Sequence, residues 1–190
     1  MPPDNNAIDL GDAVSKTSAF LLRLDPGPLA RLRRMDAHGP GESDFWQLAG
    51  RCGFLTAIQG GDEWLRLVKI MALLVPKGDP ANRGRLHQST RAFGAVLCDG
   101  GQPGWPGERP FLSENRLARF LSLPTAKRGA ALEGMVRMLA ASRAPDLGVN
   151  CLDIAYLLFS NKVQHTRKLA STYYDRLDSK SQSEQKESAA

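Results

Sequence analysis

The sequence predicts an all-α protein, and three observations support this fold class. Apolar residues recur three and four positions apart, most clearly at Leu132, Met135, Val136 and Leu139, and this spacing is typical of one buried helix face. Clusters of glycine and proline, above all at residues 99–110, separate the helical segments and indicate turns. No stretch shows a strict alternation of apolar and polar residues that would favour a β-strand over a helix.

In the N-terminal half, apolar spacing and stop signals predict five helices. Asp25 can cap a short helix that begins at Pro26, where the missing N–H group of proline needs no partner. The segment 62–75 is apolar around most of its circumference, so we expect it at the centre of the N-terminal part. The predicted helices cover residues 12–24, the short segment that begins at 26, and residues 43–55, 62–75 and 92–98.

In the C-terminal half, four helices are expected. Ser113 stands where it can cap the first of them, and Asn150 and Asp153 form a start like a capping box for the third. The four segments cover residues 114–123, 126–142, 151–159 and 162–178.

The predicted helices divide into two small helical bundles, at residues 8–98 and 111–178. Residues 99–110, between the two bundles, are rich in closely spaced glycines and prolines. This composition predicts a Gly/Pro-rich linker or flexible loop. The last residues, 179–190, are polar and lack aromatic side chains, so we expect a disordered tail.

The composition is that of a globular protein with an excess of positive charge. Of 190 residues, 42% are hydrophobic and 24% charged, the formal net charge is +5, and the pI is about 9.3. Arginine supplies 17 of the 25 basic residues. Its planar guanidinium suits bidentate phosphate contacts, although a GC-rich gene would produce the same bias. An anionic partner is a hypothesis that the charge supports without establishing it.

Candidate catalytic and metal-binding residues are scarce. The cysteines Cys52, Cys98 and Cys151 form no C-x-x-C pair and lie among apolar neighbours, so we expect them to be buried. The three histidines are isolated, and no metal-ligand, nucleophile or phosphate-loop motif occurs. We therefore predict no enzyme activity, no metal and no cofactor. No segment reads as a signal peptide or membrane span, so the cytoplasm, without membrane contact, is the expected location.

Basic residues recur on the sides of helices that face away from the predicted core. In the short helix after Pro26, Leu32 marks the buried side, so Arg31 and Arg34 should point outward while the stem of Arg33 covers the apolar edge. Each of these residues taken alone is also compatible with an ordinary solvated surface.

The same pattern returns at the starts of the C-terminal helices. Lys127 and Arg128 occupy a first turn, where two cations and the free backbone N–H groups can together hold an anion. Arg119 lies opposite the apolar stripe of its helix, Arg116 flanks that stripe, and Lys162 precedes the last helix. We predict an anion-binding surface from this recurrence.

Several segments, in order, resemble the CasB family, the small subunit of the type I-E Cascade, which is a CRISPR RNA-guided surveillance complex. The likeness runs over roughly residues 12–177 and combines an Arg-Arg pair, an aromatic pair before leucine, a glycine-containing short helix and a final basic helix. The segments are LARLRRM, DFWQLA, FGAVL, RPFLSENRLARFLSLPTAKRGAALEGMVRMLAAS and LDIAYLLFSNKVQHTRKLASTYY.

The resemblance implies an all-α, non-catalytic protein in two small helical parts. It implies a second copy stacked head to tail, neighbouring backbone and large subunits, and a basic face that stabilises the guide RNA–target DNA and the displaced non-target DNA strand. The basic positions of the family fall on Arg34, Arg91, Arg116, Arg119, either Lys127 or Arg128, and Lys162. The chain departs from the family in the segment DGGQPGWPGERP and in the polar tail.

Two other classes remain open from the residues. A helical protein–protein adaptor would use the same arginines for solubility or for acidic partners. A helical DNA-binding regulator would need a recognition helix with side chains arrayed for base edges, and none is evident. Trp105 is the one aromatic residue we considered for base stacking, and a role as a loop anchor is the plainer interpretation of it.

Overall fold

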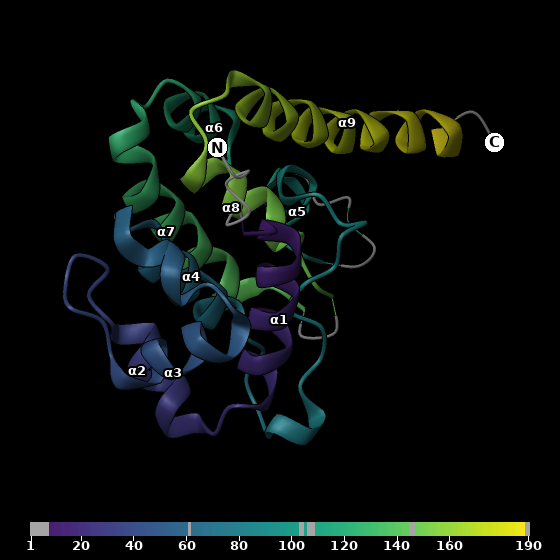
Figure 1. Cartoon of the computed structure of the whole chain (residues 1–190). Coiled ribbons are helices and arrows are strands. Elements are labelled where there is room, and N and C mark those ends of the chain that lie inside the picture. The colour runs from purple at the N-terminus through teal and green to yellow at the C-terminus, as the bar shows by residue number, and fades with distance from the viewer. Residues whose placement is uncertain (1–7, 61, 103–104, 106–108, 145–146, 189–190) are drawn as a thin grey trace.

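The computed structural model describes residues 8–60, 62–102, 105, 109–144 and 147–188, and it confirms the all-α prediction (Figure 1). Within these ranges it contains nine α-helices, two short 3-10 helices and no strand. The α-helices are α1 (Leu10–Arg23), α2 (Pro26–Arg34), α3 (Ser43–Cys52), α4 (Glu63–Leu74), α5 (Phe93–Asp99), α6 (Glu114–Leu121), α7 (Thr125–Ser142), α8 (Cys151–Phe159) and α9 (Val163–Ser188). The 3-10 helices are η1 (Leu55–Gly60) and η2 (Pro80–Asn82).

The helix starts follow the local signals only in part. The side chain of Asn150 caps α8 by accepting a bond of 3.1 Å from the backbone N–H of Leu152. Ser113 occupies the N-cap position of α6 and Asp62 that of α4, but neither side chain makes a capping bond. Asp62 instead pairs with the ring of His38, so a distant contact replaces the local cap.

Helix α4 is the centre of the molecule. All but two of its residues are buried, and it packs against α1 and α2 on one side and α7 and α8 on the other. The buried apolar side chains of both halves form one cluster, from Ala13 to Tyr173. The three cysteines lie buried within this cluster, as predicted.

Helix α5 packs more extensively on α9 than on any other element. A helix that the sequence assigns to the N-terminal part therefore rests on the C-terminal part. Trp105, the described residue in the middle of the Gly/Pro-rich segment, is half-buried against the shared core, and the Arg176 guanidinium lies 5.4 Å from the centre of its ring. This packing favours the loop-anchor interpretation of Trp105. The division into two bundles stays a prediction, and residues 103–104 and 106–108 lie outside the described part.

The end of the chain differs from the sequence-based expectation. Residues 179–190 were expected to be disordered, whereas α9 continues to Ser188 and extends beyond the other helices in Figure 1. The buried side chains of Leu169 and Tyr173 attach the first half of α9 to the core, and extending a helix that is already nucleated costs far less than starting one. Residues 189–190 lie outside the described part.

Candidate nucleic-acid interface

Four of the seven predicted basic residues are exposed and unpaired. Within the described part of the chain, no hydrogen bond or ion pair engages the side chains of Arg34, Arg119, Lys127 and Lys162. Each lies at or near a helix end, so its backbone is held while its charge faces solvent. These are the properties that contact with a phosphate backbone requires.

The other three predicted residues already have partners inside the protein. Arg128 is half-buried, and its Nε donates to the carbonyl oxygen of Leu123 at 3.1 Å. Nη1 of the exposed Arg116 lies 3.6 Å from the sulfur of Met138. Arg91 pairs with Asp99. Between the alternatives Lys127 and Arg128, the structure therefore leaves Lys127 as the free cation.

The predicted residues do not form one patch. Figure 1 places α6 and the beginnings of α7 and α9 at one end of the molecule and α2 at the other. Thr125 and Ala126 line one pocket with Leu157 and Leu158, so the first turn of α7 adjoins the end of α8 that leads to Lys162. We call the exposed Arg119, Lys127, Lys162 and Arg167 at this end the basic end. Arg34 belongs to another element, at the C-terminal end of α2.

Much of the arginine excess serves a structural role that the sequence did not reveal. Arg83 donates from Nη1 to the carbonyl oxygens of Leu21, Leu22 and Leu24, the last at 2.7 Å, and so closes the C-terminal end of α1. Free carbonyl groups at a helix end need such donors.

Two further arginines close the C-terminal end of α4. Arg33 donates to the carbonyl oxygens of Ala72 and Val75, both at 2.9 Å, and Arg143 donates to that of Leu74. Arg33 thus does more than cover an apolar edge with its stem. Burial lowers the pKa of both guanidinium groups, as expected for charges taken partly out of water.

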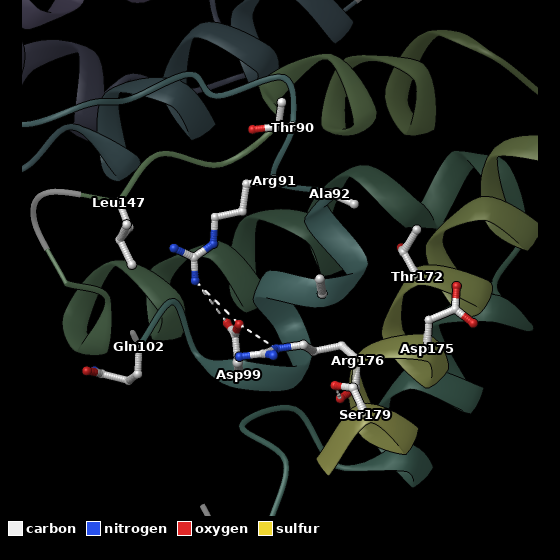
Figure 2. A pocket seen from close by; sticks show the side chains of 11 residues that line it. Thr90, Arg91, Ala92, Asp99, Gln102, Leu147, Thr172, Asp175, Arg176 and Ser179 are labelled. Atoms are coloured by element: carbon white, nitrogen blue, oxygen red, sulfur yellow. Dashed lines mark hydrogen bonds and ion pairs between the residues drawn. The ribbon is translucent and has the colours of Figure 1, made fainter. Parts of the chain in front are cut away.

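Arg91 belongs to an ion cluster that joins α5 to α9. The Asp99 carboxylate is 5% exposed and accepts from Arg91 Nη2 at 3.3 and 3.4 Å, from Arg176 Nε at 3.0 Å and from the backbone N–H of Gly101 at 2.9 Å (Figure 2). One carboxylate between two guanidinium groups leaves each arginine with unused N–H donors. Sequence reasoning missed Arg176, because only the packing of α9 on α5 brings it to Asp99.

The cluster lines an open groove of about 560 Å³. Thr90, Gln102, Thr172, Asp175 and Ser179 also line it (Figure 2). Since two arginines and two aspartates line this groove, its formal charge is balanced. The groove therefore has no net charge, and the basic end carries the stronger attraction for a polyanion.

The arrangement as a whole defines an all-α protein with unpaired cations at helix ends. No helix in the described ranges combines the length and the apolar character needed to cross a bilayer. In the same ranges, no three His, Cys, Asp or Glu side chains gather as metal ligands would. No family model, curated protein or solved structure matches the chain. The resemblance to CasB therefore stays a prediction.

Proposed function

We propose that the chain is the non-catalytic small subunit of a type I-E CRISPR Cascade complex. In this proposal its basic surface binds target DNA and the displaced non-target strand while the R-loop forms. The observation that carries the proposal is the basic end, where Arg119, Lys127 and Lys162 occupy positions implied by the family and have no carboxylate partner among the described residues. The ordered segments that resemble the CasB family support the assignment to a Cascade complex.

Such a subunit needs little more than positive charges at fixed positions along the path of the strands. Pairing with the guide RNA reads the sequence, and the protein only has to hold the backbone of the opened strands. The partners are then the guide RNA–target DNA, the displaced strand, and the backbone and large subunits, in the cytoplasm. No active site is needed for this role.

A head-to-tail pair of copies extends the basic surface of one chain. Arg34 lies at the C-terminal end of α2, on a different element from the cations of the basic end. A head-to-tail stack repeats both groups of cations from one copy to the next, so a strand that runs along the stack contacts cations of more than one copy.

Charge reversal at the basic end tests the proposal. The triple variant Arg119→Glu, Lys127→Glu and Lys162→Glu is compared with a matched variant that has the same charge change elsewhere, Lys16→Glu, Arg51→Glu and Lys77→Glu, all at exposed residues. In the reconstituted complex, log K against log salt should lose about 2 units of slope in the first variant, because each phosphate contact contributes about 0.7–0.9. Equal slopes and equal R-loop lifetimes in both variants would show that the site assignment is wrong.

A protein–protein adaptor is the second candidate, favoured by two large apolar side chains on the surface. Trp46 on α3 is 41% exposed and Leu55 on η1 is 48% exposed. An adaptor predicts that the free protein does not bind single-stranded DNA at low salt, while a Trp46→Ser variant fails to assemble. The basic-end proposal predicts the opposite result in the DNA-binding experiment.

A further inference from the structure

Two aromatic rings stack on each other where α8 turns into α9. The rings of Tyr156, on α8, and His165, on α9, lie 4.6 Å apart between centres and are within 10° of parallel. The two residues are nine positions apart and come from different helices, so no single helix wheel predicts the pair.

The stacked pair remains accessible. Tyr156 is 37% exposed, although it belongs to a helix that is otherwise largely buried. The ring face of Tyr156 that contacts His165 is covered by that ring, so the exposed surface of Tyr156 is the part that does not contact His165.

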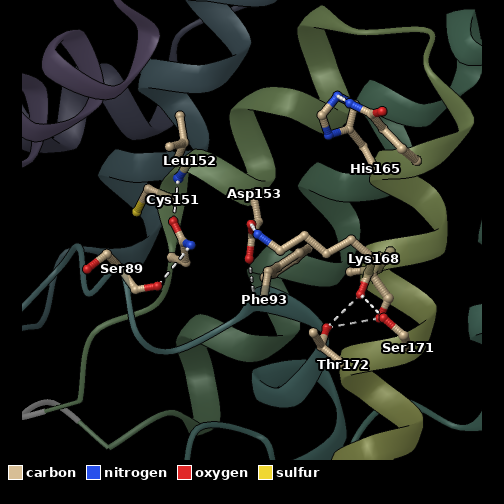
Figure 3. Close-up of polar contacts among 12 residues, drawn as sticks. Ser89, Phe93, Cys151, Leu152, Asp153, His165, Lys168, Ser171 and Thr172 are labelled. Atoms are coloured by element: carbon tan, nitrogen blue, oxygen red, sulfur yellow. Dashed lines mark hydrogen bonds and ion pairs between the residues drawn. The ribbon is translucent and has the colours of Figure 1, made fainter.

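The corner is held rigidly. Lys168 on α9 donates from Nζ to Asp153 Oδ1 on α8 at 2.7 Å, and Asp153 Oδ2 accepts from the backbone N–H of Phe93 on α5 at 3.0 Å (Figure 3). One half-buried carboxylate thus joins three helices next to the stack. A fixed aromatic surface loses little side-chain freedom when a ligand covers it.

One free cation stands next to the pair. Lys162 is exposed and has no side-chain partner within the described residues, and its backbone carbonyl accepts from the N–H of His165 at 3.2 Å, whereas Lys168 is neutralised by Asp153. The surroundings therefore combine an exposed aromatic stack with a free cation. Proteins that hold single strands use this combination, in which bases stack on rings and phosphates contact the cations.

We propose that Tyr156 and His165 form a stacking platform for an unpaired base of a bound single strand. A phosphate beside that base contacts Lys162. The proposal rests on the proposed function and adds to it a base contact that is independent of base identity, because every base has a face that can stack.

Tyr174, on α9, provides a matched control for Tyr156. It is 39% exposed, close to the value for Tyr156, but its ring meets Tyr173 edge-on, with centres 5.3 Å apart. Burial raises the pKa of the Tyr174 hydroxyl, and the neighbouring Glu114 carboxylate raises this pKa further. A neighbouring carboxylate repels phosphate, so the Tyr174 surface should not bind the strand.

The experiment compares two probes on the free, full-length protein: an oligodeoxyadenosine and an oligonucleotide of equal length whose central nucleotides lack bases. Tyr156→Leu should weaken binding of the first about tenfold and leave the second unchanged, because stacking needs the base. Tyr156→Phe should keep the wild-type affinity, and Tyr174→Leu should not differ from wild type. A 2-aminopurine probe should lose its binding-induced quenching in Tyr156→Leu alone.

The outcomes separate the platform from the proposed function. If the wild-type protein binds both probes equally and with a normal salt slope, the platform is excluded while the proposed function stands. If Tyr156→Leu weakens both probes to the same degree, the rings only join α8 to α9, and the platform is again wrong. If the protein binds neither probe at low salt, both proposals fail.

Discussion

Gly94 on α5 lies directly against Leu169 on α9, with no room for a side chain between them. A β-carbon at Gly94 would stand 2.2 Å from the carbonyl oxygen of Leu169, 2.3 Å from the hydroxyl oxygen of Thr172 and 2.9 Å from the backbone nitrogen of Tyr173. Two of these three neighbours are backbone atoms, which cannot rotate away. The close approach of α5 to α9 therefore depends on glycine at this position.

Replacing Gly94 by alanine should lower the free energy of unfolding by about 3 kcal/mol, because the helices must separate to admit the methyl group. Urea denaturation measures the loss. Gly134→Ala on α7 is the control: a β-carbon there meets nothing within 4 Å, so helix propensity should raise the stability by about 0.5–1 kcal/mol. Equal effects of the two substitutions would contradict the packing of α5 on α9.

His87 makes the stability depend on pH near neutrality. Its Nδ1 accepts from the backbone N–H of Cys151 at 3.1 Å, which requires a neutral ring. Burial lowers the pKa of His87 from its ordinary 6.5, and the nearby Asp153 offsets part of this effect. The unfolded chain therefore binds a proton at higher pH than the folded one, and stability should fall as the pH drops below 6.5.

The slope from this one residue is at most about 1.4 kcal/mol per pH unit. In His87→Asn the amide oxygen replaces Nδ1 as acceptor and does not titrate, so the free energy of unfolding should vary less between about pH 7 and about pH 5. Urea unfolding at each pH measures both proteins. A slope that is the same in the variant would assign the dependence to another group.

Glu133 adds a second pH dependence, in acid. It is 13% exposed and accepts from Lys69 at 2.9 Å and from Arg137 at 2.6 Å, with Arg66 at 3.5 Å. Burial alone would raise the pKa of Glu133, but the bonds from Arg137 and Lys69 outweigh it and hold the pKa below the ordinary 4.5. The stabilisation is present above 4.5 and should be lost as the pH falls further.

Glu133→Gln should cost about 3 kcal/mol at neutral pH, because buried cations lose their counter-charge. It should also flatten the stability profile below the ordinary pKa of glutamate. Glu63→Gln on α4 is the control, since no partner of Glu63 is found in the described structure, and its effect should stay within about 0.5 kcal/mol. An acid profile that is unchanged in Glu133→Gln would refute the assignment.

Asp99→Asn should destabilise the protein by about 3 kcal/mol, because Arg91 and Arg176 lose the buried carboxylate that they share. Asp175→Asn removes the same charge from an exposed position in the same groove and should change the stability by less than about 0.5 kcal/mol. Thermal unfolding of the two variants compares them directly. Similar losses in both would mean that the ion cluster contributes little.

The sequence pattern within single helices predicted only part of the candidate site. The sequence predicted outward-facing charge for Arg34 and Arg119, and both are exposed, with no side-chain partner among the described residues. It set Arg33 apart as a cover for an apolar edge, but it did not indicate that Arg33 and Arg143 bind the carbonyl groups at the end of α4. A helix wheel describes one helix, whereas the partner of each arginine lies on another.

The Tyr156–His165 pair escaped prediction for the same reason. Tyr156 occurs in a helix whose other residues are mostly buried and apolar, so nothing in its neighbourhood indicated a surface ring. Trp105, the aromatic residue considered for base stacking and interpreted as a loop anchor, packs against the core and Arg176.

The sequence by itself determined the fold class, the order of the helices and most of their bounds. Helix formation depends on spacing, capping and turn residues within a few positions of each other, and these are read locally. Only the tertiary structure decided which arginines are free, why Gly94 is a glycine and where two rings meet. Those features join residues up to 77 positions apart, as Asp99 and Arg176 do, and arise only when the helices pack together.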